Sequence, residues 1–315
     1  MSKIIYEIMH RENCVAQIST VGECKIYLED FMPYDLMLEE SNDFDKRIKN
    51  AMSFYSWCAS RIIPPDRTYA KEILNSIGAS QGVTDRERAQ IALSYHCLSL
   101  LDVFWVKEEN EKIRFEDINL FAHSLSNALV DIALRGHQMT VTNAHLLAND
   151  LSTGGLYPKA WVRKEDGFYL YKDGGRDAVE REVLASKICR CFDCHQVLYE
   201  QGMFENELVS ISKIMTSQRY SLVTYAAYDV YCTNHDWNTL DKILELDAPG
   251  YYMMNILDYL VGNTDRHWEN WGLLVDNETN QPIRLHDLMD FNRAFQQYDT
   301  PEGANCLTVG KRHLS

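Results

Sequence analysis

One polar string constrains this chain more than any other feature of its sequence. Residues 262–270 read Gly-Asn-Thr-Asp-Arg-His-Trp-Glu-Asn and follow Tyr251–Val261, an apolar segment with helical periodicity. After the string, Trp271–Val275 and Ile283–Leu285 are short apolar segments joined by a turn, which predicts a hairpin. We therefore expect the string to be a loop held between a helix and a hairpin.

The oxygen-bearing side chains of this loop have a spacing that suits phosphoryl transfer. Asp265 precedes Asn270 by five residues, and a second acid, Asp290, follows Asp265 by 25 residues and opens the string Asp-Phe-Asn. Phosphoryl transfer needs a base near the acceptor hydroxyl and hard oxygen ligands for Mg²⁺. Asp265 is the candidate base, and Asn270 and Asp290 are the candidate metal ligands. Asp287 competes with Asp290, which we favour because it opens its string.

The region upstream of this loop predicts a small β-rich lobe followed by helices. A glycine-containing turn, Ser152–Lys159, precedes two short segments that predict a hairpin, Ala160–Arg163 and Phe168–Lys172. A helix is predicted next over Ala178–Cys191. Further strands are expected near Gln196–Tyr199 and Leu208–Met215, and a further helix at Leu222–Tyr231.

The string Asp265-Arg266-His267-x-x-Asn270, followed by Asp290-Phe291-Asn292, resembles the catalytic loop and metal acid of the HipA-like serine/threonine kinases. The resemblance covers about residues 150–300. It implies an α+β, two-lobed protein-kinase-like fold with a small β-rich N-lobe and a helical C-lobe. It also implies ATP and Mg²⁺ as cofactors.

The resemblance extends to the glycine-containing turn. Residues Ser152 to Lys159 look like the phosphate-binding loop of the family, so Ser152, Gly154, Gly155 and Lys159 are candidate nucleotide-binding residues. Ser152 lies seven residues before Lys159, which matches the family spacing of a serine that can be autophosphorylated. A cap or turn role for Ser152 is the alternative.

Two further residues are carried over from the family. Lys172 ends the second strand, where the lysine that contacts the nucleotide phosphates belongs. Glu182, on the next helix, is the candidate ion-pair partner of that lysine, and Glu180 is its competitor. We prefer Glu182 because it begins the apolar stretch Val183–Ile188.

Three regions are predicted along the chain: a mostly helical region at 1–150, a β-rich nucleotide-binding lobe at 151–217 and a helical catalytic lobe at 218–315. The last is expected to be incomplete, because HipA-like kinases usually continue with a sizeable helical segment and only 25 residues follow Asp290 here. A hairpin around Gly22 is expected in the first region, which otherwise does not resemble the small β-rich N-terminal domain of the longer toxins. Its helices are predicted at Phe44–Ile63, Tyr69–Ile77, Arg86–Trp105 and Ile118–Leu134.

Composition limits the partners and the location. The 31 Lys and Arg residues are outnumbered by 46 Asp and Glu, giving a net charge of -15, so direct nucleic-acid or membrane binding is not expected. The N-terminus lacks a signal-peptide pattern, which makes a cytoplasmic location the default. The segment Cys189–His195 holds three thiols and an imidazole, but we interpret it as reduced cysteines on a helix and turn rather than as a zinc or haem site.

The leading interpretation is an ATP- and Mg²⁺-dependent kinase that phosphorylates a Ser or Thr hydroxyl of a protein acceptor, with a regulatory protein as a second partner. A nucleotide-binding pseudokinase or interaction module is the alternative from another class. A phosphoinositide-type lipid kinase shares the loop pattern, but an acidic chain is poorly suited to anionic membranes.

Overall fold

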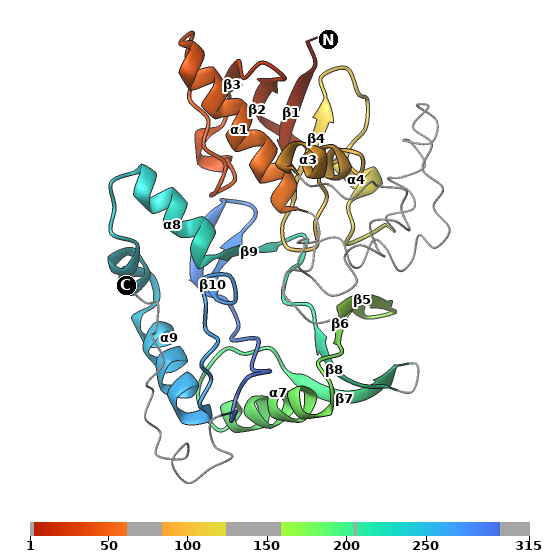
Figure 1. Ribbon diagram of the computed structural model, residues 1–315, viewed down its shortest axis with the longest axis vertical. Coiled ribbons are helices and arrows are strands. Elements are labelled where there is room, and N and C mark those ends of the chain that lie inside the picture. Colours follow the sequence, from red (N-terminus) through yellow and green to blue (C-terminus); the bar gives the residue numbers. More distant parts are fainter. Residues whose placement is uncertain (1–2, 62–83, 124–158, 205–206, 297–315) are drawn as a thin grey trace. The chain divides into compact units, whose positions relative to one another are not determined.

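The computed structural model of the protein describes residues 3–61, 84–123, 159–204 and 207–296. The chain divides into two compact units, Met1–Leu156 and Tyr157–Ser315, each with its own sheets (Figure 1). The fold is a mixture of helices and antiparallel sheets. The finer division at residue 217 and the two-lobed arrangement remain predictions.

The first unit contains a four-stranded antiparallel sheet with the order β3-β2-β1-β4. The hairpin between β2 and β3 turns at Gly22, where φ is +78° and an added Cβ would lie 1.8 Å from the Arg47 carbonyl oxygen. Only glycine fits that position, as expected for a hairpin around Gly22. The strands are β1 (Ile5–His10), β2 (Asn13–Ser19), β3 (Cys24–Ile26) and β4 (Phe104–Glu108). The helices are the 3-10 turn η1 (Glu29–Phe31), α1 (Phe44–Ser60), α3 (Asp85–Leu93) and α4 (Phe115–Ile118).

The prediction of a mostly helical region over residues 1–150 missed this sheet. The helix predicted over Arg86–Trp105 ends at Leu93, and His96 and Cys97 then adopt φ of 58° and 53°, which breaks the helix. The chain continues into β4, whose first three residues are all buried. An apolar strand buried on both faces cannot be distinguished from a buried helix by periodicity alone.

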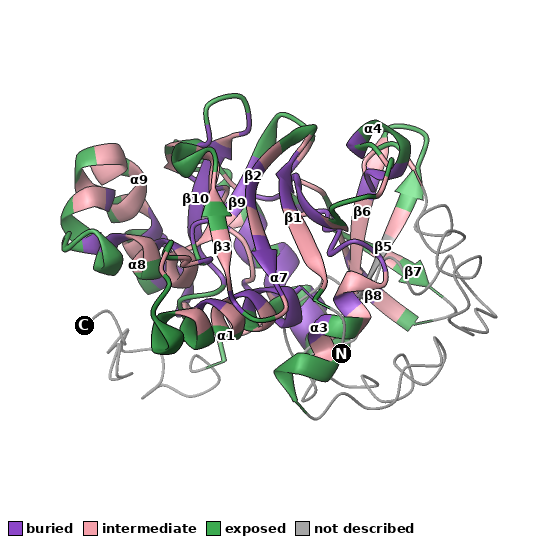
Figure 2. Cartoon of the chain, turned by 90° about the horizontal axis from the view of Figure 1, so that it is seen from above, coloured by how far each residue is buried: buried purple, intermediate pink, exposed green. Residues whose placement is uncertain are grey.

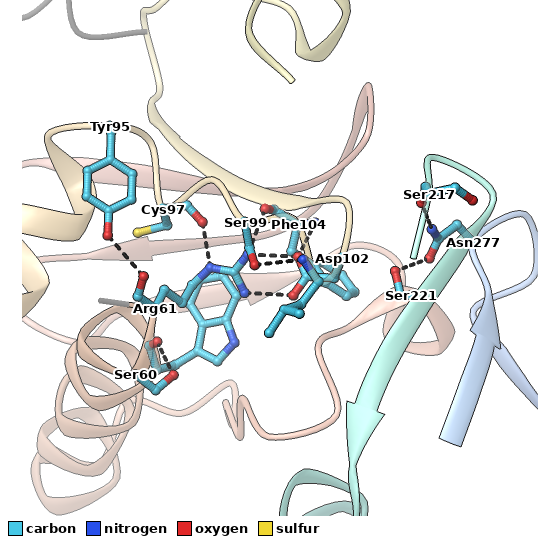
Figure 3. Close-up of polar contacts among 12 residues, drawn as sticks. Ser60, Arg61, Tyr95, Cys97, Ser99, Asp102, Phe104, Ser217, Ser221 and Asn277 are labelled. Carbon is cyan, nitrogen blue, oxygen red and sulfur yellow. Dashed lines mark hydrogen bonds and ion pairs between the residues drawn. The ribbon is translucent and has the colours of Figure 1, made fainter. Parts of the chain in front are cut away.

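A buried guanidinium joins the end of α1 to the chain that leads into β4, as Figure 3 shows. Arg61 donates to both carboxylate oxygens of Asp102, at 2.9 and 2.7 Å, and lies 4.8 Å from the ring centroid of Trp57. Its Nε donates to the Cys97 carbonyl, and the Tyr95 hydroxyl donates to the Arg61 carbonyl at 3.0 Å. A carboxylate, a backbone carbonyl and an aromatic ring thus satisfy a guanidinium charge that burial alone would penalise.

The second unit contains two antiparallel sheets, with the orders β5-β6-β8-β7 and β11-β10-β9. The first comprises β5 (Lys159–Lys164), β6 (Gly167–Lys172), β7 (Tyr199–Phe204) and β8 (Glu207–Lys213). The second comprises β9 (Tyr220–Thr224), β10 (Gly272–Asp276) and β11 (Gln281–Leu285). The helices are α7 (Arg176–Cys189), α8 (Tyr225–Asn234) and α9 (Thr239–Val261). The middle strands β2 and β10 carry many of the buried residues of their sheets (Figure 2).

Both hairpins predicted for this unit are confirmed, as β5–β6 and β10–β11. The helix predicted at Leu222–Tyr231 is wrong at its start, because Leu222 and Val223 belong to β9 and pair with Leu274 and Leu273. That partner strand lies about 50 residues away, so a local apolar pattern does not reveal it. The strand predicted at Gln196–Tyr199 is also displaced, since β7 begins at Tyr199.

The helix α9 positions the polar loop. Its regular geometry breaks at Asp247, whose carboxylate caps the second half by accepting from the Gly250 N–H at 2.9 Å and also accepts from the Leu285 N–H at 3.0 Å. Pro249 lies in the first turn after this break, where its missing N–H leaves no bond unmade. The helix ends at Gly262 in the left-handed conformation, with φ of 62°, and the chain turns into the loop.

The turn of the β10–β11 hairpin is fixed by the buried amide of Asn277, which Figure 3 shows with Ser217 and Ser221. Asn277 accepts a hydrogen bond from the Ser221 hydroxyl at 2.6 Å and donates to the Gln218 and Ser217 carbonyls at 3.2 and 3.5 Å. These bonds tie the turn to β9 and to the chain before it.

Among the helices in the described ranges, none is long and apolar enough to cross a membrane.

Candidate active site

The loop between α9 and β10 is fixed by its own polar groups. Asp258, in the last turn of α9, accepts from the Asn263 amide at 2.9 Å, and the Asn263 side-chain oxygen accepts from the Asp265 N–H at 3.3 Å. The Asp265 carbonyl accepts from the Asn270 amide and, at 2.9 Å, from the His267 N–H. The predicted base and one predicted metal ligand therefore lie on one compact, internally bonded loop.

A buried arginine joins this loop to the chain that leads to Asp290. Arg266 donates from Nε and Nη2 to the two carboxylate oxygens of Asp258, at 3.0 and 2.9 Å. Its Nη1 donates both to the Asn270 carbonyl at 2.9 Å and to the Met289 carbonyl at 2.6 Å. Because one nitrogen binds both carbonyls, Asn270 lies close to the residue that precedes Asp290.

Burial lowers the pKa of Arg266, but the adjacent Asp258 carboxylate more than offsets it, so the pKa lies above its ordinary value. The arginine side chain is 7% exposed and that of its partner 6% exposed. This charge pair is deeply buried, and backbone carbonyls accept from the remaining N–H groups of Arg266. The pair therefore holds the loop and the segment before Asp290 together and does not contact substrate.

The side chain of Lys172 brings two predicted site residues together. Its ammonium nitrogen lies 2.8 Å from Glu182 Oε1 and 3.2 Å from Asp290 Oδ1. The second oxygen of Glu182 accepts a hydrogen bond from the Ser210 hydroxyl. The end of β6, the helix α7, the strand β8 and the segment after β11 thus meet at one buried ion pair.

Lys172 remains charged at this point. Burial lowers its pKa, but Asp290 and Glu182 raise it by more, and the pKa lies well above its ordinary value. The carboxylate of Asp290 is 26% exposed, whereas that of Glu182 is 1% exposed. Glu182 is therefore suited to hold the lysine, and Asp290 is open to exchange the lysine for another cation.

The carboxylate of Asp265 is partly exposed and has a basic neighbour. Arg293 Nη1 lies 3.3 Å from Asp265 Oδ1, with 38% of the arginine side chain and 29% of the aspartate side chain exposed. A base for an incoming hydroxyl must be reachable from outside. Asp265 meets that requirement.

Two buried amide oxygens near these residues have no hydrogen-bond partner within the described part of the chain. They are Oδ1 of Asn270 and Oδ1 of Asn292, whereas buried polar atoms are normally paired. Amide oxygens of this kind and a carboxylate such as that of Asp290 are the hard donors that Mg²⁺ prefers. Asn292 also lines a small pocket with the Lys172–Glu182 pair, together with Gly174, Ala178, Val179 and Ser210.

The cysteine-rich segment forms no comparable site. The thiols of Cys191 and Cys194 lie near the carbonyls of Lys187 and Cys189, at 3.9 and 3.5 Å. Across the described part of the chain, no group of three or more His, Cys, Asp or Glu side chains is placed to hold a metal ion.

The competing candidates have other partners. Glu180 pairs with Arg176 at 3.3 Å on the exposed side of α7, and Asp287 pairs with Arg284 at 2.8 Å. Neither is among the carboxylates that contact Lys172.

Most of the predicted phosphate-binding loop lies outside the described residues. Ser152, Gly154 and Gly155 lie outside the described residues. The backbone of Lys159 begins β5 and pairs in register with Lys172, while its side chain is not among those described. The predicted roles of these four residues stay predictions.

Four residues of the site were not assigned a role from the sequence: Tyr199, Ser210, Asn292 and Arg293. Asn292 and Arg293 follow Asp290 closely, so their proximity to the acid was a usable signal. No local pattern marks Tyr199 or Ser210, because their positions depend on how β7 and β8 pair.

No protein-family model matches the chain, and no curated protein matches its sequence. Solved structures do match. HipA from the Shewanella oneidensis complex of HipA, HipB and operator DNA aligns with a TM-score of 0.50 and 12% identity, over 93% of this chain and 77% of that chain. The Helicobacter pylori proinflammatory kinase CtkA aligns with a TM-score of 0.37 and 19% identity, over 44% of this chain and 55% of that chain.

The likeness to HipA shows the fold. The protein has the fold of the HipA-like kinases, and at 93% coverage the alignment with HipA extends into both units. The first unit, which was expected not to resemble the small β-rich N-terminal domain of the longer toxins, contains a four-stranded sheet that the sequence did not predict. The chain spans about half the length of CtkA, 55%.

Proposed function

We propose that this protein is an ATP- and Mg²⁺-dependent kinase that transfers a phosphoryl group to a Ser or Thr hydroxyl of a protein. The single observation that carries the proposal is the position of Lys172, whose ammonium contacts Glu182 at 2.8 Å and Asp290 at 3.2 Å. A lysine paired with a helix glutamate beside a metal acid is the arrangement that kinases need. The HipA-like kinase fold supports the proposal.

Nucleotide binding is assigned to the residues around this pair. Lys172, held by Glu182, would contact the phosphates. Asp290 and the unpartnered side-chain oxygen of Asn270 would hold Mg²⁺, which when bound neutralises charge on the β- and γ-phosphates. Ser152, Gly154, Gly155 and Lys159 are proposed to line the phosphates from the preceding loop.

Transfer is assigned to Asp265. Its carboxylate would orient the acceptor hydroxyl and take its proton as the acceptor oxygen bonds to the γ-phosphorus. The bond from that phosphorus to the bridging oxygen breaks at the same time, and ADP leaves. The hydrogen bonds that the Asp265 backbone makes with Asn263, His267 and Asn270 keep this carboxylate in one place during the step.

The proposed partners are a protein acceptor and a regulatory protein. The net charge of -15 argues against direct nucleic-acid or membrane contact, and the proposed location is cytoplasmic. The solved HipA structure contains HipB and operator DNA. For the present chain we propose only that its regulatory partner is a protein.

The proposal is tested by incubating the purified protein with γ-labelled ATP and Mg²⁺, beside the Asp265→Ala variant, and mapping the labelled residue by mass spectrometry. We expect label in the wild type alone, and its position tests Ser152 as the phosphorylated residue. Mg·ATP binding without transfer to any added protein acceptor would instead identify a pseudokinase.

A further inference from the structure

Tyr199 contacts both ends of the proposed nucleotide site. It is the first residue of β7 and is 4% exposed. Its hydroxyl accepts a hydrogen bond from the Asp290 N–H at 3.1 Å, and its ring centroid lies 5.1 Å from Lys172 Nζ. One buried side chain therefore touches the metal acid through its hydroxyl and the lysine through its ring.

The backbone that Tyr199 binds is in an uncommon conformation. Asp290 has φ of 61°, in the left-handed region that non-glycine residues seldom occupy. Such a conformation persists only where the surroundings hold it. Here the Arg266 guanidinium binds the carbonyl of Met289, and the Tyr199 hydroxyl binds the next N–H, that of Asp290.

The chain that leads to Tyr199 is also joined to both sides of the site. The Val197 N–H donates to the Leu288 carbonyl at 2.9 Å, and the Leu288 N–H donates to the His195 carbonyl at 3.0 Å. The Tyr199 N–H donates to the hydroxyl of Ser186 at 3.2 Å, and Ser186 lies one turn after Glu182 on α7. Residues 195–199 thus connect α7, whose Glu182 binds Lys172, to the segment that carries Asp290.

We propose that Tyr199 is a positioning residue that fixes the backbone of the metal acid Asp290 and the ammonium of Lys172 relative to each other. The inference rests on the proposed function, because it assigns Tyr199 to the support of that site. The hydroxyl sets where the Asp290 carboxylate is presented to the cation. The ring packs against the ammonium of Lys172.

The hydroxyl can be removed without removing the ring. In Tyr199→Phe the N–H of Asp290 loses its acceptor, while the packing of the ring and its contact with Lys172 are kept. Loss of a residue that orients a metal ligand typically lowers metal affinity by 10- to 100-fold. We therefore expect the dissociation constant for Mg·ATP to rise by about 10-fold.

The test compares Tyr199→Phe with Tyr169→Phe in the full chain. Tyr169 lies in the same sheet, and its hydroxyl donates at 2.6 Å to the exposed carboxylate of Asp166, so the chemical change is identical but lies outside the site. Calorimetry measures ATP affinity with Mg²⁺ and with EDTA. Hydrogen exchange with mass spectrometry measures protection of the peptide that contains Asp290.

A positioning role predicts that Tyr199→Phe weakens ATP binding with Mg²⁺ by about 10-fold and with EDTA by less than about twofold, and speeds exchange at Asp290. Tyr169→Phe should match the wild type in all three. Equal losses with Mg²⁺ and with EDTA would indicate general damage and overturn the inference, as would unchanged exchange. A wild type that binds no Mg·ATP overturns the proposed function instead, and the exchange data still decide whether Tyr199 holds Asp290.

Discussion

The ammonium of Lys172 lies 3.2 Å from a carboxylate oxygen of Asp290. In this state the lysine neutralises the acid that is proposed to hold Mg²⁺. In the proposed complex, Asp290 would instead hold the cation and Lys172 would contact the phosphates, so that each charged side chain would change partner without becoming unpaired. Glu182, which is buried and accepts a hydrogen bond from Ser210, would hold the lysine in both states.

Replacement of Glu182 by Gln should lower kcat/KM for ATP by about 10²-fold, since a misplaced lysine no longer meets the phosphates. The measurement is steady-state phosphoryl transfer over a range of ATP concentrations. Glu180→Gln is the matched control, because it makes the same change on the same helix at an exposed residue paired with Arg176. Equal effects of the two substitutions would remove Glu182 from the site.

Replacement of Asn270 by Ala removes the unpartnered buried oxygen. We expect the Mg²⁺ concentration for half-maximal ATP binding to rise by at least about 10-fold. The matched control is Asn234→Ala on α8, where the amide donates to the Val230 carbonyl at the surface. An unchanged Mg²⁺ requirement in Asn270→Ala would show that this oxygen is not a metal ligand.

Replacement of Asp258 by Ala should destabilise the second unit by about 3–5 kcal/mol, because it leaves the Arg266 guanidinium buried without its carboxylate. Urea unfolding measures the change. Glu245→Ala breaks an exposed pair with Lys242 on the same helix and should cost no more than about 1 kcal/mol. Comparable decreases in the free energy of unfolding in both variants would contradict the structural role of the buried Arg266–Asp258 pair.

The stability of the first unit should fall as the pH is lowered from about 6.5 to 4. Burial between the rings of Phe31 and Phe104 lowers the pKa of His10 from 6.5 to about 4, so over this range the unfolded chain binds one proton more than the folded chain. Between these pH values His10 changes the free energy of unfolding by about 1.4 kcal/mol per pH unit, and its stabilising contribution is fully present above pH 6.5. Urea midpoints at several pH values should show a shallower slope in His10→Phe. An identical slope would contradict this account.

The second unit was largely predictable because its signals are local. A turn with Asp166 and Gly167 marked the hairpin β5–β6, and the periodicity of Tyr251–Val261 marked the second half of α9. The first half of α9 was not predicted, and the break at Asp247 explains why the two halves have separate patterns. Where a strand has a distant partner, as β9 has in β10, the sequence predicted a helix instead.

The candidate site was predictable only in part. Asp265, Asn270 and Asp290 fall in short strings with a recognisable spacing, so they could be named without a structure. Tyr199 and Ser210 could not, because the first reaches Asp290 and the second reaches Glu182 only after β7, β8 and α7 have packed together. Contacts that depend on register leave no pattern along the chain.

The most direct test of the account is the Mg·ATP affinity of Asp265→Ala beside Asp290→Ala, measured by calorimetry together with single-turnover transfer from labelled ATP. The account predicts that Asp265→Ala binds Mg·ATP within about twofold of the wild type and transfers no phosphate, whereas Asp290→Ala loses at least about 10-fold in Mg·ATP affinity. Wild-type transfer by Asp265→Ala, or unchanged Mg·ATP affinity in Asp290→Ala, would contradict it.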